Sequence, residues 1–220
     1  MHFSVKNLID LKEKVNFKVK KLNFDNYTPN IIAVSKTFSM ESIKPLIEFG
    51  HIHFGENKVQ EAVEKWTLVK EKNPEIKLHM IGRLQRNKVK LAVNMFDFIH
   101  SVDNIKLAKK ISEEQKKLNK KLSIFLQVNI GGEIQKSGID MKHISQLYAE
   151  CLKLNLNVVG LMCIPPLSEP ARKYFTKIKN CNDELQLPSL SLGMSNDYLE
   201  AIEVRSNFLR IGTKIFGQRG

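Results

Sequence analysis

The chain has few cysteines, a single tryptophan and no long apolar run. Its three cysteines, Cys151, Cys163 and Cys181, lack the spacing of metal ligands, and their odd number argues against a disulfide framework. We therefore expect reduced, mostly buried thiols and no metal site. No stretch approaches the roughly 18 apolar residues of a membrane span, and residues 1–6 have no apolar signal-peptide core. These absences predict a cytoplasmic protein that does not cross a membrane.

The chain also lacks Pro/Gly/Ser-rich linkers and low-complexity segments. Its 220 residues are enough for one sizeable hydrophobic core. We therefore predict a single domain over residues 1–220, and we expect a monomer.

Acidic residues are outnumbered, since 23 Asp and Glu against 35 Lys and Arg give a formal charge of +12. Such a charge raises the question of nucleic acid, because lysines that neutralise phosphates give salt-dependent binding. The lysines are dispersed over almost every predicted helix, however, and the densest basic cluster has no interleaved aromatic residues. That cluster contains Arg83, Arg86, Lys88 and Lys90. We interpret it as a solvated face, which makes a basic RNA-binding module the weakest of our hypotheses.

Strand-like and helix-like segments alternate along the chain, which is typical of βα units and a parallel sheet. The predicted strands are Ile31–Ser35, His51–Gly55, Lys77–Ile81, Phe98–Ser101, Ser123–Val128, Val158–Cys163, Ser189–Leu192 and Phe208–Ile211. The predicted helices are Val5–Leu22, Ser42–Phe49, Val59–Lys72, Lys88–Met95, Ile105–Leu118, His143–Leu154, Glu169–Leu187 and Asp197–Val204. About eight strands is the number that closes a (β/α)8 TIM barrel, an α/β fold.

An open doubly wound sheet is the structural alternative to the barrel. Closure is favoured because the βα units are evenly spaced at roughly 25 residues. In addition, no Gly-x-Gly-x-x-Gly turn follows the first strand, as a dinucleotide-binding sheet would require. In a barrel, phosphate is commonly bound by the loops after the seventh and eighth strands. Ser195 follows the predicted seventh strand, and Gly212 and Thr213 follow the eighth.

Lys36 closes the apolar run Ile31–Ser35, which places it at the C-terminal mouth of a buried strand. A lysine in such a position can hold a carbonyl as a Schiff base when desolvation or a neighbouring cation makes it nucleophilic. The segments Leu192–Asp197 and Leu209–Thr213 are typical of two loops that bind a phosphate together. An aldehyde site beside a phosphate site suggests pyridoxal 5'-phosphate (PLP).

Seven sequence blocks resemble, in the same order, those of the pyridoxal phosphate homeostasis protein family. The blocks are Ala33–Thr37, Phe54–Glu61, His79–Lys88, Gln135–Ile139, Gly160–Pro165, Leu192–Asp197 and Arg210–Gly217. The match covers nearly the whole chain. The resemblance implies the barrel of the alanine racemase N-terminal domain, which is fold type III among PLP proteins. It also implies intracellular PLP homeostasis without an established catalytic turnover, by buffering the cofactor or delivering it to PLP-dependent apoenzymes.

The two C-terminal loops have residues suited to a phosphate. Ser195 offers a hydroxyl and a backbone N–H, and Asn196 and Asp197 begin a predicted helix whose dipole favours an anion. These three residues are also strong N-cap residues, so capping and phosphate binding are equally open from the sequence. Gly212 lets the backbone approach a phosphate closely, and Thr213 adds a hydroxyl and an N–H.

By resemblance to the racemase barrel, Arg210 faces the pyridine nitrogen of PLP. Arginine cannot accept a hydrogen bond from a protonated ring nitrogen, so the ring stays unprotonated and is a poor electron sink for carbanion chemistry. The cofactor site also includes Met194, Asn57 and His79. A helix cap explains Asn57 equally well, and a hydrogen bond in the core explains His79 equally well. Lys136 is either a second amine at the mouth or an exposed loop lysine.

A Schiff-base enzyme is the second hypothesis, either an amino-acid racemase or a phosphosugar aldolase on the same barrel. Racemisation needs acid/base groups on both faces of the substrate. The chain supplies one obvious lysine and ends at Gly220, before the second domain that contributes the opposite tyrosine in such racemases. An aldolase needs an acid/base partner beside the lysine, and none is apparent. One departure from the family pattern is Arg205, which replaces a usual glycine and is expected to alter the turn before the last strand.

Overall fold

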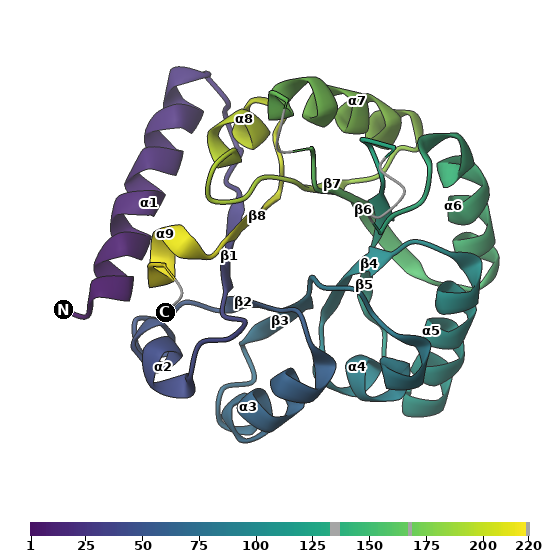
Figure 1. Ribbon diagram of the computed structural model, residues 1–220, viewed down its shortest axis with the longest axis horizontal. Helices are drawn as coiled ribbons and strands as arrows, with labels where there is room; N and C mark the ends of the chain where they lie inside the picture. Colours follow the sequence, from purple (N-terminus) through teal and green to yellow (C-terminus); the bar gives the residue numbers. More distant parts are fainter. Residues whose placement is uncertain (133–136, 167–168, 219–220) are drawn as a thin grey trace.

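The computed structural model describes residues 1–132, 137–166 and 169–218. Within them, eight parallel strands form a closed barrel in chain order, and the last strand pairs with the first. The helices form a ring outside the strands (Figure 1). The predicted α/β fold and the closed (β/α)8 barrel are confirmed, and the open doubly wound sheet is excluded.

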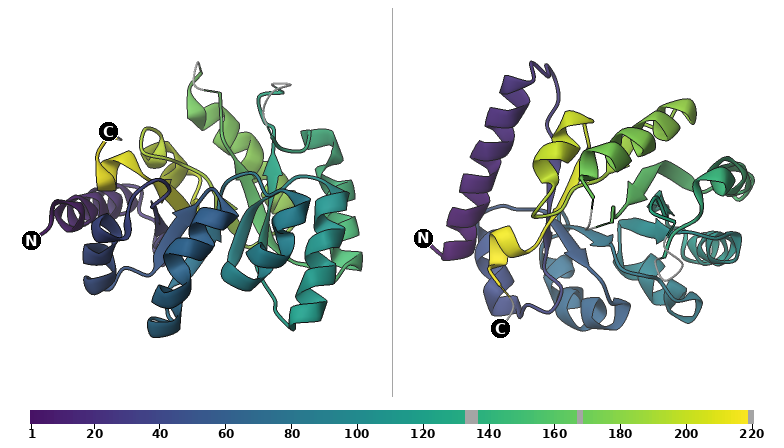
Figure 2. Two further views of the ribbon diagram at one scale, coloured as in Figure 1. Left: turned by 60° about the horizontal axis from the view of Figure 1, so that its bottom comes forward. Right: turned by 45° about the horizontal axis from the view of Figure 1, so that its top comes forward.

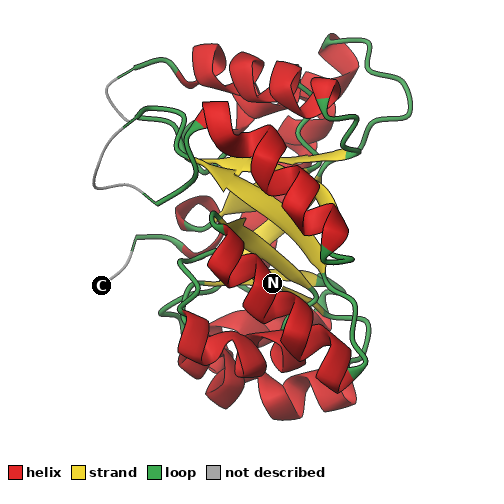
Figure 3. Cartoon of the chain, turned by 90° about the vertical axis from the view of Figure 1, so that its right-hand side faces the viewer, coloured by secondary structure: helices red, strands yellow, loops and turns green. Residues whose placement is uncertain are grey.

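The barrel strands lie at the centre of the molecule, between layers of helices (Figure 3). The strands are β1 (Asn30–Val34), β2 (His53–Glu56), β3 (Lys77–Met80), β4 (Phe98–Val102), β5 (Ser123–Val128), β6 (Asn157–Cys163), β7 (Ser189–Ser191) and β8 (Phe208–Ile211). The helices are α1 (Phe3–Lys21), α2 (Met40–Glu48), α3 (Val59–Lys72), α4 (Val89–Met95), α5 (Ile105–Leu118), α6 (Ile144–Lys153), α7 (Ala171–Glu184), α8 (Tyr198–Glu203) and α9 (Thr213–Phe216), with short 3-10 helices η1 (Arg86–Lys88) and η2 (Met141–His143). Within the described residues, no helix is both long enough and apolar enough to cross a bilayer.

Both faces of the strands are covered, which explains their continuous apolar runs. The outward-facing side chains and the helices form the main hydrophobic core. A smaller cluster of Ile32, Phe125, Met162 and Phe208 fills the interior of the barrel. Along β8 the side chains alternate, so Phe208 faces the interior cluster whereas Leu209 joins the outer core. The next residue on the inner side of β8 is Arg210.

The observed elements differ from the predicted ones mainly at their ends. The strand predicted over His51–Gly55 is observed as His53–Glu56, because the N–H of His51 bonds to the Leu46 carbonyl and completes the turn after α2. The helix predicted from Asp197 begins at Tyr198, and Asp197 precedes it without a side-chain cap bond. The short helix α9 was not predicted, since four residues are too few to show a hydrophobic period.

The N-terminal helix lies beside the last helix, so that α1 supports the segment that follows β8 (Figure 2). The Nδ2 of Asn7 donates a 3.0 Å hydrogen bond to the carbonyl of Ile215 in α9. Phe216 of α9 stacks on Phe38, in the loop after β1, with ring centroids 4.7 Å apart. These contacts position Gly212 and Thr213 next to the end of the first strand.

Arg205 lies in the turn before β8 with a φ of 56°, in the left-handed region, and its guanidinium lies 4.3 Å from the Phe24 ring centroid. A glycine would adopt this conformation freely, so the backbone here suits the glycine that is usual in the family, and an alteration of the turn by Arg205 stays a prediction. A left-handed conformation costs an L-residue about 1–2 kcal/mol. We therefore expect Arg205→Gly to be more stable than Arg205→Ala by about 1 kcal/mol in urea unfolding, since both variants lose the Phe24 contact. Equal stabilities of the two variants would contradict this explanation.

Candidate functional site

Lys36 lies two residues after the end of β1, at the C-terminal end of the barrel, where the chain turns. The ladder continues to Ser35, whose N–H donates to the Gly55 carbonyl at 3.0 Å. Thr37, on the other side of Lys36, has a φ of 68°, and its N–H donates to Glu61 Oε1 at 2.8 Å. Lys36 itself is half-buried between these two anchored neighbours. The structure therefore places this lysine at the mouth, as predicted, on a backbone that is held on both sides.

A buried ionic network supports the end of β1. Glu56, which is fully buried at the end of β2, accepts hydrogen bonds from the Ser35 hydroxyl at 2.8 Å and the Trp66 indole at 3.0 Å. Lys65 forms ion pairs with Glu56 and Glu61 at 3.0 Å each and donates to the Ser35 carbonyl at 3.1 Å. The network ties the residue before Lys36 to α3.

The two predicted phosphate loops meet. The N–H of Lys214 points to the hydroxyl of Ser195 at 3.4 Å, which joins the loop after β7 to the start of α9. Among the described residues, no acceptor bonds to the backbone N–H groups of Ser195, Gly212 or Thr213. A Cβ on Gly212 would lie 3.6 Å from Val34, so this glycine is adjacent to the end of β1. N–H donors that have no acceptor among the described residues therefore lie on two neighbouring loops, next to the strand that ends before Lys36.

Met194 and Asp197 give the first loop its shape. The N–H of Met194 donates to Asp197 Oδ1 at 2.5 Å, and Asp197 is half-buried. Burial raises the pKa of the Asp197 carboxyl, although this hydrogen bond and the charge of Arg210 oppose the rise. Ser195 is thus not an N-cap of α8 in this structure, which leaves its hydroxyl oriented toward the second loop.

Arg210 is a buried cation whose hydrogen-bonded partners are neutral. Its side chain donates from Nη1 to the Ser191 carbonyl at 2.5 Å and to the Ser191 hydroxyl at 2.7 Å, and from Nη2 to the Cys163 carbonyl at 2.9 Å. The residue is only 4% exposed, and burial lowers the pKa of its guanidinium. Within the described residues no carboxylate forms an ion pair with it. A buried positive charge of this kind favours an anionic or electron-rich ligand.

A column of three histidines crosses the barrel interior below Arg210. His53 Nδ1 lies 3.0 Å from His79 Nε2, His79 Nδ1 lies 2.9 Å from His100 Nε2, and His100 Nδ1 lies 2.8 Å from the Ser191 hydroxyl that Arg210 also contacts. Each bond between rings needs one N–H and one lone pair, and a neutral imidazole has one of each. The hydrogen bonds between the rings are therefore all formed when the rings are neutral and every ring carries its proton on the same type of nitrogen, either Nδ1 or Nε2.

Burial lowers the pKa of His79 well below its usual range, and the neighbouring His100 adds to the effect. For His100, burial again lowers the pKa most, followed by the charge of Arg210. Both rings stack on aromatic side chains, His79 on Phe98 at 4.3 Å and His100 on Phe125 at 4.4 Å between centroids. Neutral histidines in this column position Ser191, and through it Arg210, without adding charge.

The predicted site residues fall into two groups. Lys36, Ser195, Arg210, Gly212 and Thr213, together with Met194, come from the adjacent strand ends of β7, β8 and β1. The others lie elsewhere: Asn57 lines a cavity over β2 to β4, and His79 is hydrogen-bonded in the core, the second of the two interpretations given to it. A contact of either residue with a cofactor stays a prediction. Lys136 lies outside the described residues.

Several residues that shape the site were not singled out from the sequence. These are Glu56, Lys65, His100 and Ser191. The usable signal was the presence of polar residues at inward-facing positions of apolar strands, since a buried charge or imidazole needs a partner. The partners themselves come from other strands and helices, up to 91 positions away for His100 and Ser191, so no local pattern identifies them.

Comparisons with known proteins place the chain in a family. The sequence model of the alanine racemase N-terminal domain matches residues 14–220. The pyridoxal phosphate homeostasis protein of Aquifex aeolicus is 39% identical over 86% of both chains, and that of Escherichia coli K12 is 34% identical over 97% of this chain and 95% of its own. PipY of Synechococcus elongatus PCC7942, solved with PLP bound, is 31% identical with a TM-score of 0.80 over 92% of this chain and 100% of its own.

An alanine racemase from Clostridium difficile 630 is only 16% identical, with a TM-score of 0.69 over 94% of this chain and 57% of its own, and supports the fold alone. The three proteins named before it are 31–39% identical, and each match covers at least 86% of this chain and of the relative. The family predicted from the seven sequence blocks is confirmed: the chain belongs to the alanine racemase N-terminal domain family and, within it, to the pyridoxal phosphate homeostasis proteins.

Proposed function

We propose that the protein binds PLP through a Schiff base on Lys36 and acts in intracellular PLP homeostasis, as a monomer that buffers the cofactor or delivers it to apoenzymes. One observation carries the proposal. A lysine, two loops whose N–H groups have no acceptor among the described residues, and a buried arginine lie at the adjacent ends of β1, β7 and β8. The names of the relatives and the PLP bound to PipY support the choice of cofactor.

The residues present fit the chemical parts of PLP. The N–H groups of Ser195, Gly212 and Thr213 and the hydroxyls of Ser195 and Thr213 suit a phosphate, which prefers several convergent donors. Lys36 provides the amine for the aldehyde carbon. When bound, the cofactor supplies that reactive aldehyde and an electron-withdrawing ring.

Arg210 has donors left for the cofactor ring. Of the five N–H groups of a guanidinium, three are used by Ser191 and Cys163 within the described residues, which leaves the Nε–H and one Nη2–H. An arginine donates to the pyridine nitrogen and cannot protonate it at neutral pH, because its own pKa stays high even when buried. The side chain thus binds the ring and keeps it a weak electron sink. We therefore propose retention and release of the cofactor without catalytic turnover.

The test is an absorbance titration with PLP, followed by borohydride reduction and peptide mapping. Wild type and the control Lys44→Ala, which removes an exposed lysine of α2, are expected to give a reduced adduct on Lys36. Lys36→Ala is expected to lose the adduct completely, because no amine is then held at the end of β1. An adduct of equal yield in Lys36→Ala would overturn the assignment. Rapid interconversion of L- and D-alanine by the loaded wild type would instead contradict the absence of turnover.

A further inference from the structure

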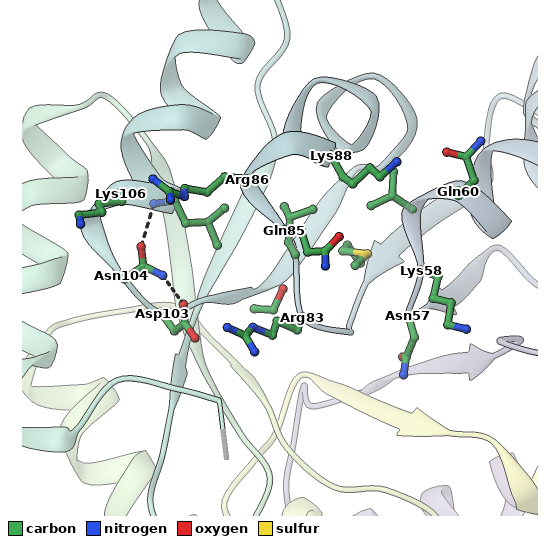
Figure 4. A pocket seen from close by; sticks show the side chains of 15 residues that line it. Asn57, Lys58, Gln60, Arg83, Gln85, Arg86, Lys88, Asp103, Asn104 and Lys106 are labelled. Carbon is green, nitrogen blue, oxygen red and sulfur yellow. Dashed lines mark hydrogen bonds between the residues drawn. The ribbon is translucent and has the colours of Figure 1, made fainter. Parts of the chain in front are cut away.

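The cavity that Asn57 lines opens at the C-terminal end of the barrel, over strands β2, β3 and β4. It has a volume of about 830 Å³, within the range of small-molecule sites. Figure 4 shows the loop after β3 across its centre, with Asn57 and Lys58 on one side and Asp103 and Asn104 on the other. Of the residues assigned above to the cofactor, only Asn57 lines it.

The lining of the cavity is strongly basic. It contains five cationic side chains, Lys58, Arg83, Arg86, Lys88 and Lys106, against a single carboxylate, Asp103. None of the five forms an ion pair with a carboxylate in the part of the chain that the structure describes. Asp103 instead accepts hydrogen bonds from Asn104 Nδ2 at 2.6 Å and from the N–H of Gly138 at 3.3 Å. Among the described residues, little negative charge therefore compensates the positive charge at this cavity. The side chains of the cluster Arg83, Arg86, Lys88 and Lys90 are exposed or half-buried, in keeping with a solvated face, and all except Lys90 also line the cavity.

A buried hydroxyl at the same cavity lacks a partner. Ser101, in β4, is 3% exposed and lines the cavity, and its Oγ makes no hydrogen bond within the described residues. An unpaired buried hydroxyl costs free energy unless a ligand or water completes it. The first turn of α3, with Lys58 at its start, also borders the cavity and has no side-chain cap. Both features point to a polar ligand.

The remaining lining residues narrow the class of ligand. Amide side chains of Asn57, Gln60 and Gln85 offer hydrogen bonds to hydroxyl or carboxyl groups. No Phe, Tyr, Trp or His is among the lining residues, so the cavity offers no ring on which a nucleobase would stack. Apolar contacts come from Val59, Met80, Leu84 and Leu107. These properties suit a compact, non-aromatic polyanion better than a nucleic acid.

We propose that this cavity binds a small hydroxylated molecule with at least two negative charges, of the sugar-phosphate or hydroxy-polycarboxylate class. Arg83 and Arg86 bind its anionic groups, since the guanidinium matches phosphate and carboxylate in a bidentate way. Ser101 and the amides bind its hydroxyls. The backbone of Gly82 packs against Asn57, where an added Cβ would lie 2.4 Å from the Asn57 carbonyl oxygen, so the loops after β2 and β3 form one rigid wall. The proposal does not depend on Lys36.

Isothermal titration of the full-length protein with pyrophosphate and, separately, with citrate tests the proposal at about 0.15 M salt, where surface attraction is screened. Binding of at least one probe is expected. The variant Arg83→Gln/Arg86→Gln should bind that probe about tenfold or more weakly, because two charge-assisted hydrogen-bonding groups are lost. The matched control is Lys90→Gln, which removes a charge of the same cluster that does not line the cavity and should change the affinity less than about twofold. Preference for one probe separates phosphate from carboxylate ligands.

Three results would overturn the proposal. They are the absence of binding of both probes, an equal loss in Lys90→Gln, and a loss of probe binding when the protein is saturated with PLP, which would place the probe in the phosphate loops. The borohydride adduct on Lys36, measured in Arg83→Gln/Arg86→Gln, reports the cofactor site independently. That adduct should be retained whether or not the cavity binds the probes.

Discussion

Acidification from about pH 6.5 to about pH 5 is expected to lower the free energy of unfolding by several kcal/mol. This decrease is larger than the one that protonation of surface carboxylates causes in the same pH range. The cause is the set of buried histidines. Burial lowers the pKa of His79 and His100 well below the usual range and that of His51 to about 3. In the unfolded chain the same imidazoles titrate near about 6.5.

The sign follows from proton linkage. Between the lowered pKa of the folded state and the ordinary pKa of the unfolded state, the unfolded chain binds more protons, so stability falls as the pH falls. Each fully buried histidine contributes a limiting slope of about 1.4 kcal/mol per pH unit. Urea unfolding at a series of pH values, followed by the fluorescence of the single buried Trp66, measures the slope.

A substitution in the column isolates its contribution. His100→Gln keeps a donor and an acceptor between His79 and Ser191 but removes one titrating ring. The slope of unfolding free energy against pH should therefore decrease by about 1.4 kcal/mol per pH unit. The exposed His143→Gln is the matched control and should leave the slope unchanged. A wild-type stability that stays flat between about pH 6.5 and about pH 5 would disprove the neutral column.

The sequence predicted the barrel well because the information for it is local. Apolar runs such as Ile31–Val34 reflect strands buried on both faces, and each is followed by a helical period. Boundaries were less predictable where a single hydrogen bond decides them, as for His51, which closes the turn after α2 rather than starting β2. The alternation that puts His53, His79 and His100 inside the barrel was visible in the strands, but their contact was not.

The candidate site was predictable only in part, because only some of its features are local in the sequence. The strand-end position of Lys36 and the glycine of the last loop are local features, and the structure brings both to one end of the barrel. The partners of Arg210 could not be predicted, because Cys163 lies 47 positions away in the chain. Basic residues around Arg83 gave a composition signal that does not distinguish a solvated face from a cavity wall, since only the spatial position of the neighbouring loops decides between them.

The buried ion pair beneath Lys36 is expected to be the most sensitive point of the fold to a single substitution. Lys65→Met should lower the free energy of unfolding by about 3–5 kcal/mol, because it leaves the carboxylate of Glu56 buried without its cation. The Glu56 carboxylate is not hydrated by solvent, because its side chain is fully buried. One of its oxygens already lacks a hydrogen-bond partner among the described residues, so the loss of Lys65 adds to an existing deficit. Loss of Lys65 also frees the Ser35 carbonyl, next to Lys36.

Two further variants make this prediction specific to the buried pair. Lys70→Met removes another ion pair of α3, with Asp97, whose side chains are 22% and 30% exposed, and should cost about 1 kcal/mol or less. In Lys65→Met/Glu56→Gln the charge is gone, while the amide oxygen still accepts from Ser35 and Trp66. The double variant should therefore recover most of the stability lost in Lys65→Met, as measured by urea unfolding. If Lys65→Met and Lys70→Met were equally stable, desolvation of Glu56 would not be the reason that the end of β1 is held in place.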